Sequence, residues 1–124
     1  MKTILVVEDE KNLRTLYSQE LEALGYQVIA TADGRAAREQ TRNRQVDLAI
    51  VDIKLNGENG LEVVRDLMQE NRNLKIILNS AYSTYMSDFT SWSADAYLVK
   101  SSDLSQLKTK VRELTAQENG HYVV

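Results

Sequence analysis

Asp47-Leu48-Ala49-Ile50-Val51-Asp52 is an uninterrupted apolar run between two aspartates. Such a short run without polar alternation is typical of a strand buried on both faces of a parallel sheet. Other short stretches of the chain are also rich in apolar or β-branched residues. The sequence therefore predicts strands over Thr3–Val7, Gln27–Thr31, Val46–Val51, Leu74–Leu78 and Ala96–Val99.

Stretches with helical spacing of apolar residues separate these strands. The first contains Leu13, Tyr17 and Leu21 at intervals of four, and Gly25 follows as a helix-ending residue. Helices are predicted over 10–24, 33–44, 61–69 and 104–114, with Ser102 placed to cap the last, and the aromatic stripe of 82–92 indicates a weaker helix. Strands that alternate with helices predict an α/β fold, a doubly wound (βα)5 three-layer sandwich.

Composition narrows the class of protein. The chain has 124 residues, a net charge of −3, no cysteine and one histidine, His121. This size predicts a single domain over 1–124, with 117–124 as a helix end and short tail. The lack of cysteine excludes disulfide scaffolds and thiolate sites, and the net negative charge argues against direct nucleic-acid binding. No targeting signal or membrane span is recognisable, so we expect a cytoplasmic protein without membrane contact.

Polar side chains stand where the predicted strands end. They are, in chain order, Glu8, Asp9, Asp52, Asn79, Ser80 and Lys100. Ligands of open α/β sheets bind beyond the carboxyl ends of the strands, so we expect these side chains to converge. Crowded carboxylates need a cation, and a set of oxygen ligands favours Mg²⁺. Each residue alone could be a helix cap, a turn residue or a solvated charge, and it is their recurrence at separate strand ends that favours a site.

The same residues carry a resemblance to a known family. The motifs are Ile4-Leu5-Val6-Val7-Glu8-Asp9-Glu10, then Asp47 to Leu55 with Gly57 and Gly60, then Ser80-Ala81, then Ala94-Asp95-Ala96-Tyr97-Leu98-Val99-Lys100. In this order and spacing the chain resembles the receiver domain of two-component response regulators, in the CheY-like superfamily. The resemblance implies a five-stranded parallel sheet of flavodoxin-like order 2-1-3-4-5. It also implies a phosphorelay switch that catalyses only its own phosphoryl transfer and dephosphorylation, rather than a metabolic enzyme.

The resemblance assigns the phosphoacceptor and the metal ligands. Asp52 would accept the phosphoryl group from a sensor histidine kinase. Glu8, Asp9, Asp52 and the main-chain carbonyl of Lys54 would hold Mg²⁺. Lys54 and Tyr82 would flank the attacking water and modulate the dephosphorylation rate, and the bulk of Tyr82 predicts slow to moderate loss of the phosphoryl group.

The resemblance also assigns the phosphoryl contacts and the switch. Ser80, Ala81 and Lys100 would bind the phosphoryl group, and Ser80 with Tyr97 would form the switch. Partner binding would use the face made by 82–92, 96–99 and 104–114. The expected partners are a sensor kinase and an unknown downstream protein, with the receiver itself a monomer or a weak homodimer through that face.

Three other classes remain open at this point. A haloacid dehalogenase-like aspartyl phosphatase would need a second aspartate where Lys54 stands. A flavodoxin-like cofactor binder would need a phosphate-binding first loop, whereas Glu8 and Asp9 would repel phosphate. A pseudo-receiver would bind partners without phosphorylation, which the intact acidic set argues against.

The absence of proline marks two departures from the family pattern. Receivers usually carry proline where Asn56 stands, and Lys-Pro, often with a cis bond, where Lys100-Ser101 stands. A cis bond before a residue other than proline costs about 2.5–4 kcal/mol, so we expect a trans bond and a redrawn loop. From Ser80 to Lys100 the chain is also about two residues shorter than the usual pattern, which predicts a short or shifted fourth helix.

Overall fold

The computed structural model describes residues 1–81 and 94–120, so the predicted helix over 82–92, with Tyr82, lies outside the described residues. The helices are α1 (Lys11–Ala23), α2 (Gly34–Asn43), α3 (Gly60–Glu70) and α5 (Ser105–Gly120). The strands are β1 (Thr3–Val7), β2 (Gln27–Thr31), β3 (Leu48–Val51), β4 (Lys54–Leu55), β5 (Glu58–Asn59), β6 (Lys75–Ser80) and β7 (Ala96–Val99). Among these helices, none is long and apolar enough to cross a membrane.

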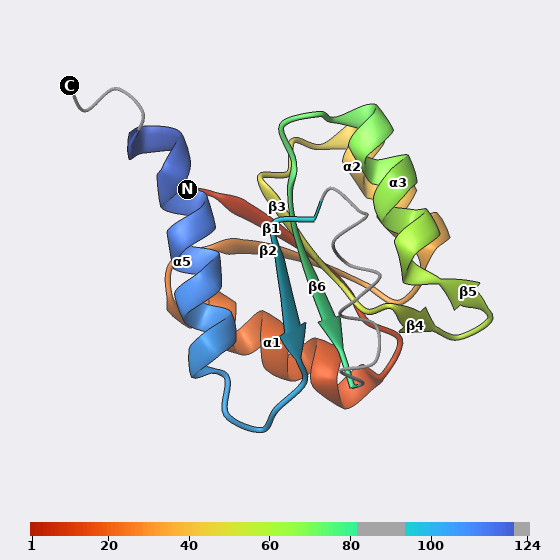
Figure 1. The fold of residues 1–124 in the computed structure, drawn as a ribbon, viewed down its shortest axis with the longest axis horizontal. Helices are drawn as coiled ribbons and strands as arrows, with labels where there is room; N and C mark the ends of the chain where they lie inside the picture. The colour runs from red at the N-terminus through yellow and green to blue at the C-terminus, as the bar shows by residue number, and fades with distance from the viewer. Residues whose placement is uncertain (82–93, 121–124) are drawn as a thin grey trace.

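The longer strands form one parallel sheet in the order β2-β1-β3-β6-β7 (Figure 1). Counted among themselves these strands run 2-1-3-4-5, which confirms the predicted topology. The register pairs Val7 with Val51, Val51 with Leu78, and Ser80 with Val99. Because all five strands point the same way, their carboxyl ends share one edge of the sheet.

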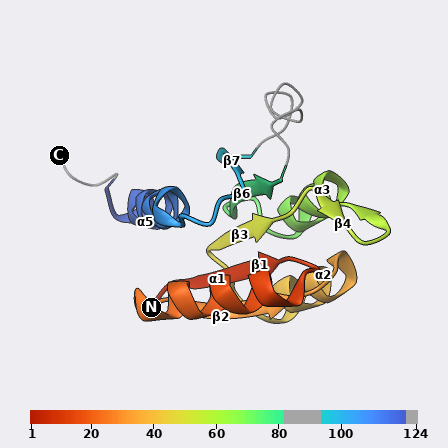
Figure 2. The ribbon, with the colours of Figure 1, turned by 90° about the horizontal axis from the view of Figure 1, so that it is seen from below.

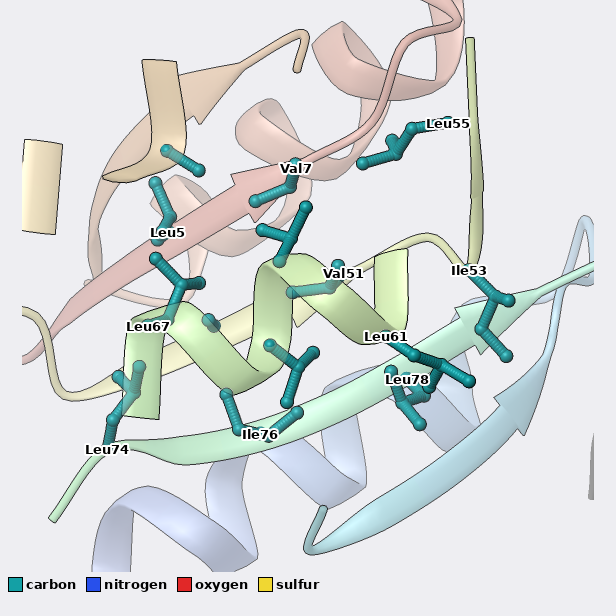
Figure 3. Packing of buried hydrophobic residues seen from close by; sticks show 14 of the residues in the cluster. Leu5, Val7, Val51, Ile53, Leu55, Leu61, Leu67, Leu74, Ile76 and Leu78 are labelled. Atoms are coloured by element: carbon teal, nitrogen blue, oxygen red, sulfur yellow. The ribbon is translucent and has the colours of Figure 1, made fainter. Parts of the chain in front are cut away.

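Helices cover both faces of this sheet (Figures 1 and 2). On one face α2 and α3 close a core that includes Leu5, Leu67 and Ile76, all fully buried (Figure 3). On the other face α1 and α5 close a second core that includes Ile4 and Val111. Neighbouring strand residues such as Ile4 and Leu5 point to opposite cores, so the uninterrupted apolar runs are explained by burial on both faces.

Helix α1 begins and ends at local signals in the sequence. The Glu10 carboxylate caps it by accepting from the amide of Leu13 at 2.8 Å. At the other end Gly25 has φ 97°, and the amide of Tyr26 donates to the carbonyl of Leu21 at 3.3 Å. This is a Schellman motif, for which glycine is favoured because a side chain would strain that backbone. The predicted ending of the first helix is confirmed.

The start of α5 differs from the prediction. Ser102 was expected to cap this helix, but the carboxylate of Asp103 accepts from the amide of Ser105 at 2.9 Å instead. The amide of Asp103 donates in turn to the hydroxyl of Ser101 at 3.1 Å. The prediction of Ser102 was wrong because a carboxylate nearer the helix satisfies the free amide. The helix itself runs on to Gly120, so the first part of the expected tail is helical.

A short antiparallel hairpin after β3 was not predicted. Strands β4 and β5 pair Lys54 with Asn59 and Leu55 with Glu58, and Gly57 turns the chain at φ 74°. The hairpin lies beside the N-terminal ends of α2 and α3 (Figure 1). The Asn-Gly dipeptide of 56–57 is a known hairpin signal, and it would have predicted this element.

Candidate functional site

The carboxylates of Glu8, Asp9 and Asp52 meet at the carboxyl edge of the sheet. Backbone hydrogen bonds carry the pairing past the strand ends, since the amide of Asp52 donates to Val7 at 3.1 Å and that of Glu8 to Thr31 at 3.0 Å. One oxygen from each carboxylate lies within 4.8 Å of the others. Glu8 and Asp52 are buried, at 2% and 6% exposed, whereas Asp9 is partly exposed. The prediction that these three acids lie close together is confirmed.

Lys100 joins this acidic group from the end of β7. Its Nζ lies 2.7 Å from Oε1 of Glu8 and 2.9 Å from Oδ2 of Asp52. Its amide donates to the carbonyl of Ser80 at 2.7 Å, so the backbone that carries Lys100 is held on β6. The bond between Lys100 and Ser101 is trans, as expected, because the described residues contain no cis peptide bond. A trans loop therefore still brings the ammonium group to both acids.

Burial and charge shift the pKa values of the site in a consistent way. Burial raises the pKa of Asp52 and of Glu8, and hydrogen bonds from Lys100 oppose this shift without cancelling it. Burial by itself would lower the pKa of Lys100, but its bonds to Glu8 and Asp52 outweigh burial and raise it. The two carboxylates share a single ammonium group, so the negative charge of Glu8 and Asp52 exceeds the positive charge of Lys100. A bound cation would reduce this excess of negative charge.

Glu8 and Asp9 belong to the acidic site rather than to the cap of α1. Because Glu10 caps α1, the simpler interpretation of Glu8 and Asp9 as the helix cap does not hold. The amide of Glu10 donates to Oε2 of Glu8 at 3.1 Å. Arg14 donates to the carbonyl oxygens of Glu8 at 2.8 Å and Asp9 at 3.3 Å, and so orders the loop that carries both acids.

The donor set fits a hard divalent cation. Three carboxylates from two strand ends offer oxygen ligands alone, which suits Mg²⁺ better than softer metals. The amide of Lys54 donates to Oδ1 of Asp52 at 3.2 Å, so the main chain of Lys54 lies directly beside the acidic group. Its side chain is exposed. Glu8, Asp9 and Asp52 are thus the residues that could hold the ion, and the carbonyl of Lys54 stays a predicted ligand.

The remaining predicted site residues lie on β6 and β7. Ser80 is the last residue of β6 and is 1% exposed, and Ala81 follows it at the surface. Strand β6 thus continues past the predicted end at Leu78. Tyr97 pairs with Leu78 and is 8% exposed, so its ring is packed inward with the core under α3. This burial fits a plain strand aromatic as well as a switch residue, whose role stays a prediction.

A buried polar pair next to the site was missed at the sequence level. Nδ2 of Asn79 on β6 donates to the hydroxyl of Tyr17 on α1 at 3.1 Å, and both residues are at most 4% exposed. The sequence patterns identify Asn79 only as a polar residue at a strand end and Tyr17 only as an apolar position of a helix. The available signal was an amide within an apolar strand, since buried polar groups nearly always have partners.

The geometry and the chain's similarity to known proteins agree. The family model for the response regulator receiver domain matches residues 4–112. The chain belongs to this family and is the receiver domain of a two-component response regulator. Members of the family are signalling proteins rather than classical enzymes.

Individual relatives support the same family. The chain is 33% identical over 119 residues to the response regulator ArlR of Staphylococcus saprophyticus, covering 95% of this chain and 54% of that protein. The chain therefore spans about half the length of the curated relatives that it matches.

Solved structures give the same fold. The response regulator TrrA of Thermotoga maritima, in complex with Mg²⁺-BeF, is 44% identical with a TM-score of 0.86 and covers 92% of this chain and 99% of that one. TrrA has also been solved in complex with the histidine kinase ThkA, at 44% identity and a TM-score of 0.84, with coverage of 92% and 98%. A CheY-like receiver of Methanospirillum hungatei is 26% identical with a TM-score of 0.90, covering 98% of each chain.

Proposed function

We propose that this receiver accepts a phosphoryl group on Asp52 from a sensor histidine kinase, in the presence of Mg²⁺, and so changes its binding to a partner protein. The observation that carries the proposal is the contact of one ammonium group, that of Lys100, with both Glu8 and Asp52 at the shared edge of the sheet. The relative TrrA supplies the comparison, with one structure bound to Mg²⁺-BeF and another to a histidine kinase.

In the proposed transfer, an oxygen of the Asp52 carboxylate attacks phosphorus and forms an acyl phosphate. The bond from phosphorus to the kinase histidine nitrogen breaks, and its electron pair returns to the imidazole. Bound Mg²⁺, held by Glu8, Asp9, Asp52 and the carbonyl of Lys54, would offset negative charge on the transferring group. Asp52 must be ionised to attack, and a bound cation would favour the ionised form against the burial that raises its pKa in the metal-free protein.

Lys100 would change its ion-pair partner during the reaction. Before transfer its ammonium group pairs with Glu8 and Asp52. After transfer it would pair with a phosphoryl oxygen, while the hydroxyl of Ser80 and the amide of Ala81 would donate to others. Ser80 ends β6 and Lys100 directly follows β7, and the pairing of these strands holds both residues near Asp52 before the reaction.

The switch would follow from the same contacts. Movement of Ser80 toward the phosphoryl group would change the packing beside Tyr97, which lies on the same face of the sheet two positions across the β6–β7 ladder. Such a change is a shift between two packings of one fold. The surface that would respond comprises 82–92, β7 and α5, where a downstream protein or a second copy of the chain would bind.

The proposal is tested by incubating the protein with acetyl phosphate and Mg²⁺ and measuring bound phosphoryl group by intact-mass spectrometry. We expect one phosphoryl group on the native protein, none after chelation of the metal, and none on Asp52→Asn. Asp47→Asn is a matched control, because Asp47 precedes the same strand at its opposite end. Equal labelling of Asp52→Asn would place the phosphoryl group on another residue and contradict the proposal. No labelling of the native protein would instead point to a pseudo-receiver.

A further inference from the structure

The carboxylate of Glu58 ties the hairpin after the phosphoacceptor strand to helix α2. Its Oε1 accepts from the amide of Gly34 at 2.9 Å, and its Oε2 accepts from Nη1 of Arg38 at 2.9 Å. Gly34 is the first residue of α2, so the carboxylate also lies at the positive end of the helix dipole. Arg38 is held in place on its other side, since its Nε donates to Oδ2 of Asp66 at 2.8 Å.

The contact depends on close approach of the hairpin to α2. A Cβ added to Gly34 would lie 2.5 Å from Oε2 of Glu58 and 2.6 Å from Cγ2 of Val63. No side chain fits there, so the bare backbone of Gly34 is what allows the carboxylate to reach the helix. The side chains of Arg38 and Glu58 are only 25% and 26% exposed, which screens this ion pair less than an open surface pair.

The same hairpin is joined to the acidic site at its other end. Glu58 pairs with Leu55 and Lys54 with Asn59, and the amide of Lys54 donates to Oδ1 of Asp52. After the hairpin, the amide of Gly60 donates to the carbonyl of Ile53 at 2.6 Å. A Cβ on Gly60 would lie 2.0 Å from the carbonyl oxygen of Asp52, so the chain returns directly against the phosphoacceptor backbone. Displacement of Glu58 would therefore shift the backbone of Asp52 and Lys54.

We propose that Glu58 is a positioning residue that holds the main chain of Lys54 at the metal site through its bonds to Gly34 and Arg38. This inference rests on the proposed function, because it concerns the metal bound for phosphoryl transfer. The hairpin contains no proline to restrict its backbone. Instead, the hydrogen bond from Gly34 and the ion pair with Arg38 hold it against α2. Substitution of a residue that orients a metal ligand typically weakens metal binding by roughly 10–100-fold. Substitution of a residue that acts through the main chain should weaken it less.

The chain offers a control in a second ion pair made by an arginine of α2. Arg42 of α2 and Glu70 of α3 form an ion pair at 3.4 Å that touches neither the hairpin nor the acidic site. Glu58→Gln and Glu70→Gln thus each remove one carboxylate charge from an arginine of α2. Only the first removes a contact to the loop that follows Asp52.

The test compares native protein, Glu58→Gln and Glu70→Gln in two measurements. Without metal, hydrogen exchange followed by NMR reports the protection of the Lys54 and Gly60 amides. With metal, calorimetric titration reports the Kd for Mg²⁺. We expect Glu58→Gln to speed exchange of these amides about tenfold and to weaken Mg²⁺ binding roughly fivefold, and Glu70→Gln to change both less than about twofold.

A variant of Arg38 distinguishes positioning of the loop from a general loss of stability. Arg38→Gln should reproduce part of the effect of Glu58→Gln, because it removes the ion pair but leaves the bond from the amide of Gly34. The double variant should be no worse than Glu58→Gln alone in amide exchange and Mg²⁺ affinity. Equal Mg²⁺ affinity and equal amide protection in Glu58→Gln and native protein would overturn the inference. If native protein itself failed to bind Mg²⁺, the proposed function would fail, while hydrogen exchange would still report whether Glu58 holds the loop.

Discussion

Nζ of Lys100 lies 2.9 Å from Oδ2 of Asp52, although the two residues are 48 positions apart in the chain. The same nitrogen reaches Glu8 at 2.7 Å. One ammonium group thus serves two buried carboxylates, with Asp9 close by. The metal-free site holds more negative than positive charge, and its stability should respond to any change in that balance.

Removal of the ammonium group should destabilise the metal-free protein. In Lys100→Met the buried carboxylates of Glu8 and Asp52 would lose their shared cation. Breaking a buried ion pair from one side typically costs about 3–5 kcal/mol, and we expect about 3 kcal/mol here because Lys100 is partly exposed. Urea unfolding in the presence of a chelator measures this cost. Lys110→Met, on α5, is the control, and equal stability of the two variants would contradict the charge argument.

Removal of the Asp52 charge should act in the opposite direction. Asp52→Asn keeps the shape of the side chain and leaves Lys100 paired with Glu8. Because burial raises the pKa of Asp52, its ionised form is less favoured in the folded state than in the unfolded chain. We expect Asp52→Asn to raise Tm without metal by about 3–6 °C, the shift that roughly 1 kcal/mol gives in a domain of this size. A fall in Tm would show that Asp52 stabilises the fold.

The raised pKa values also fix the sign of a pH dependence. Without metal, Asp52 and Glu8 bind protons more tightly in the folded protein than at their ordinary values of 3.8 and 4.5. Their contribution to stability is therefore fully present below those values and is lost as pH rises through the folded pKa. The difference in unfolding free energy between Asp52→Asn and native protein should widen from pH 4 to pH 7. A constant difference would contradict the assigned direction.

Addition of Mg²⁺ should stabilise the native protein. A ligand that binds only the folded state at ten times its Kd adds roughly 1.4 kcal/mol to the unfolding free energy. We expect Tm to rise by about 5 °C on this basis, and chelation to reverse the rise. Asp9→Asn should lose most of the response, because one of three clustered carboxylates is removed. Ca²⁺ at the same concentration tests selectivity, and an equal response of Asp9→Asn would exclude Asp9 as a ligand.

The hydrogen bond between Asn79 and Tyr17 should show strong non-additivity. Either Tyr17→Phe or Asn79→Leu leaves one buried polar group without its partner, which costs about 1–3 kcal/mol. The double variant replaces both by apolar groups of similar shape and should be nearly as stable as the native protein. Chemical unfolding of the four proteins gives the coupling energy. Additive losses would mean that each side chain contributes independently.

Much of the fold could be predicted from the sequence, because its signals are local. Uninterrupted apolar runs such as Leu48–Val51 require burial on both faces, and this requirement selects a parallel sheet covered by helices. Parallel strands place their carboxyl ends at one edge, so Glu8, Asp52 and Lys100 had to meet there once the strands were found. Strand ends were less certain, and β6 continues to Ser80 because its last residues pair with β7.

Only the tertiary structure decided which side chains pair. The bonds of Glu58 to Gly34 and Arg38, and of Asn79 to Tyr17, join residues 20 to 62 positions apart. Such hydrogen bonds form only if packing positions the two groups with a precision of a few tenths of an ångström. Local sequence preferences do not encode that positioning. The sequence by itself therefore determined the parallel sheet and the chemistry at its edge, and the resemblance to the receiver family supplied the strand order. Packing determined how Lys100 is shared between two acids and how the loop after Asp52 is held.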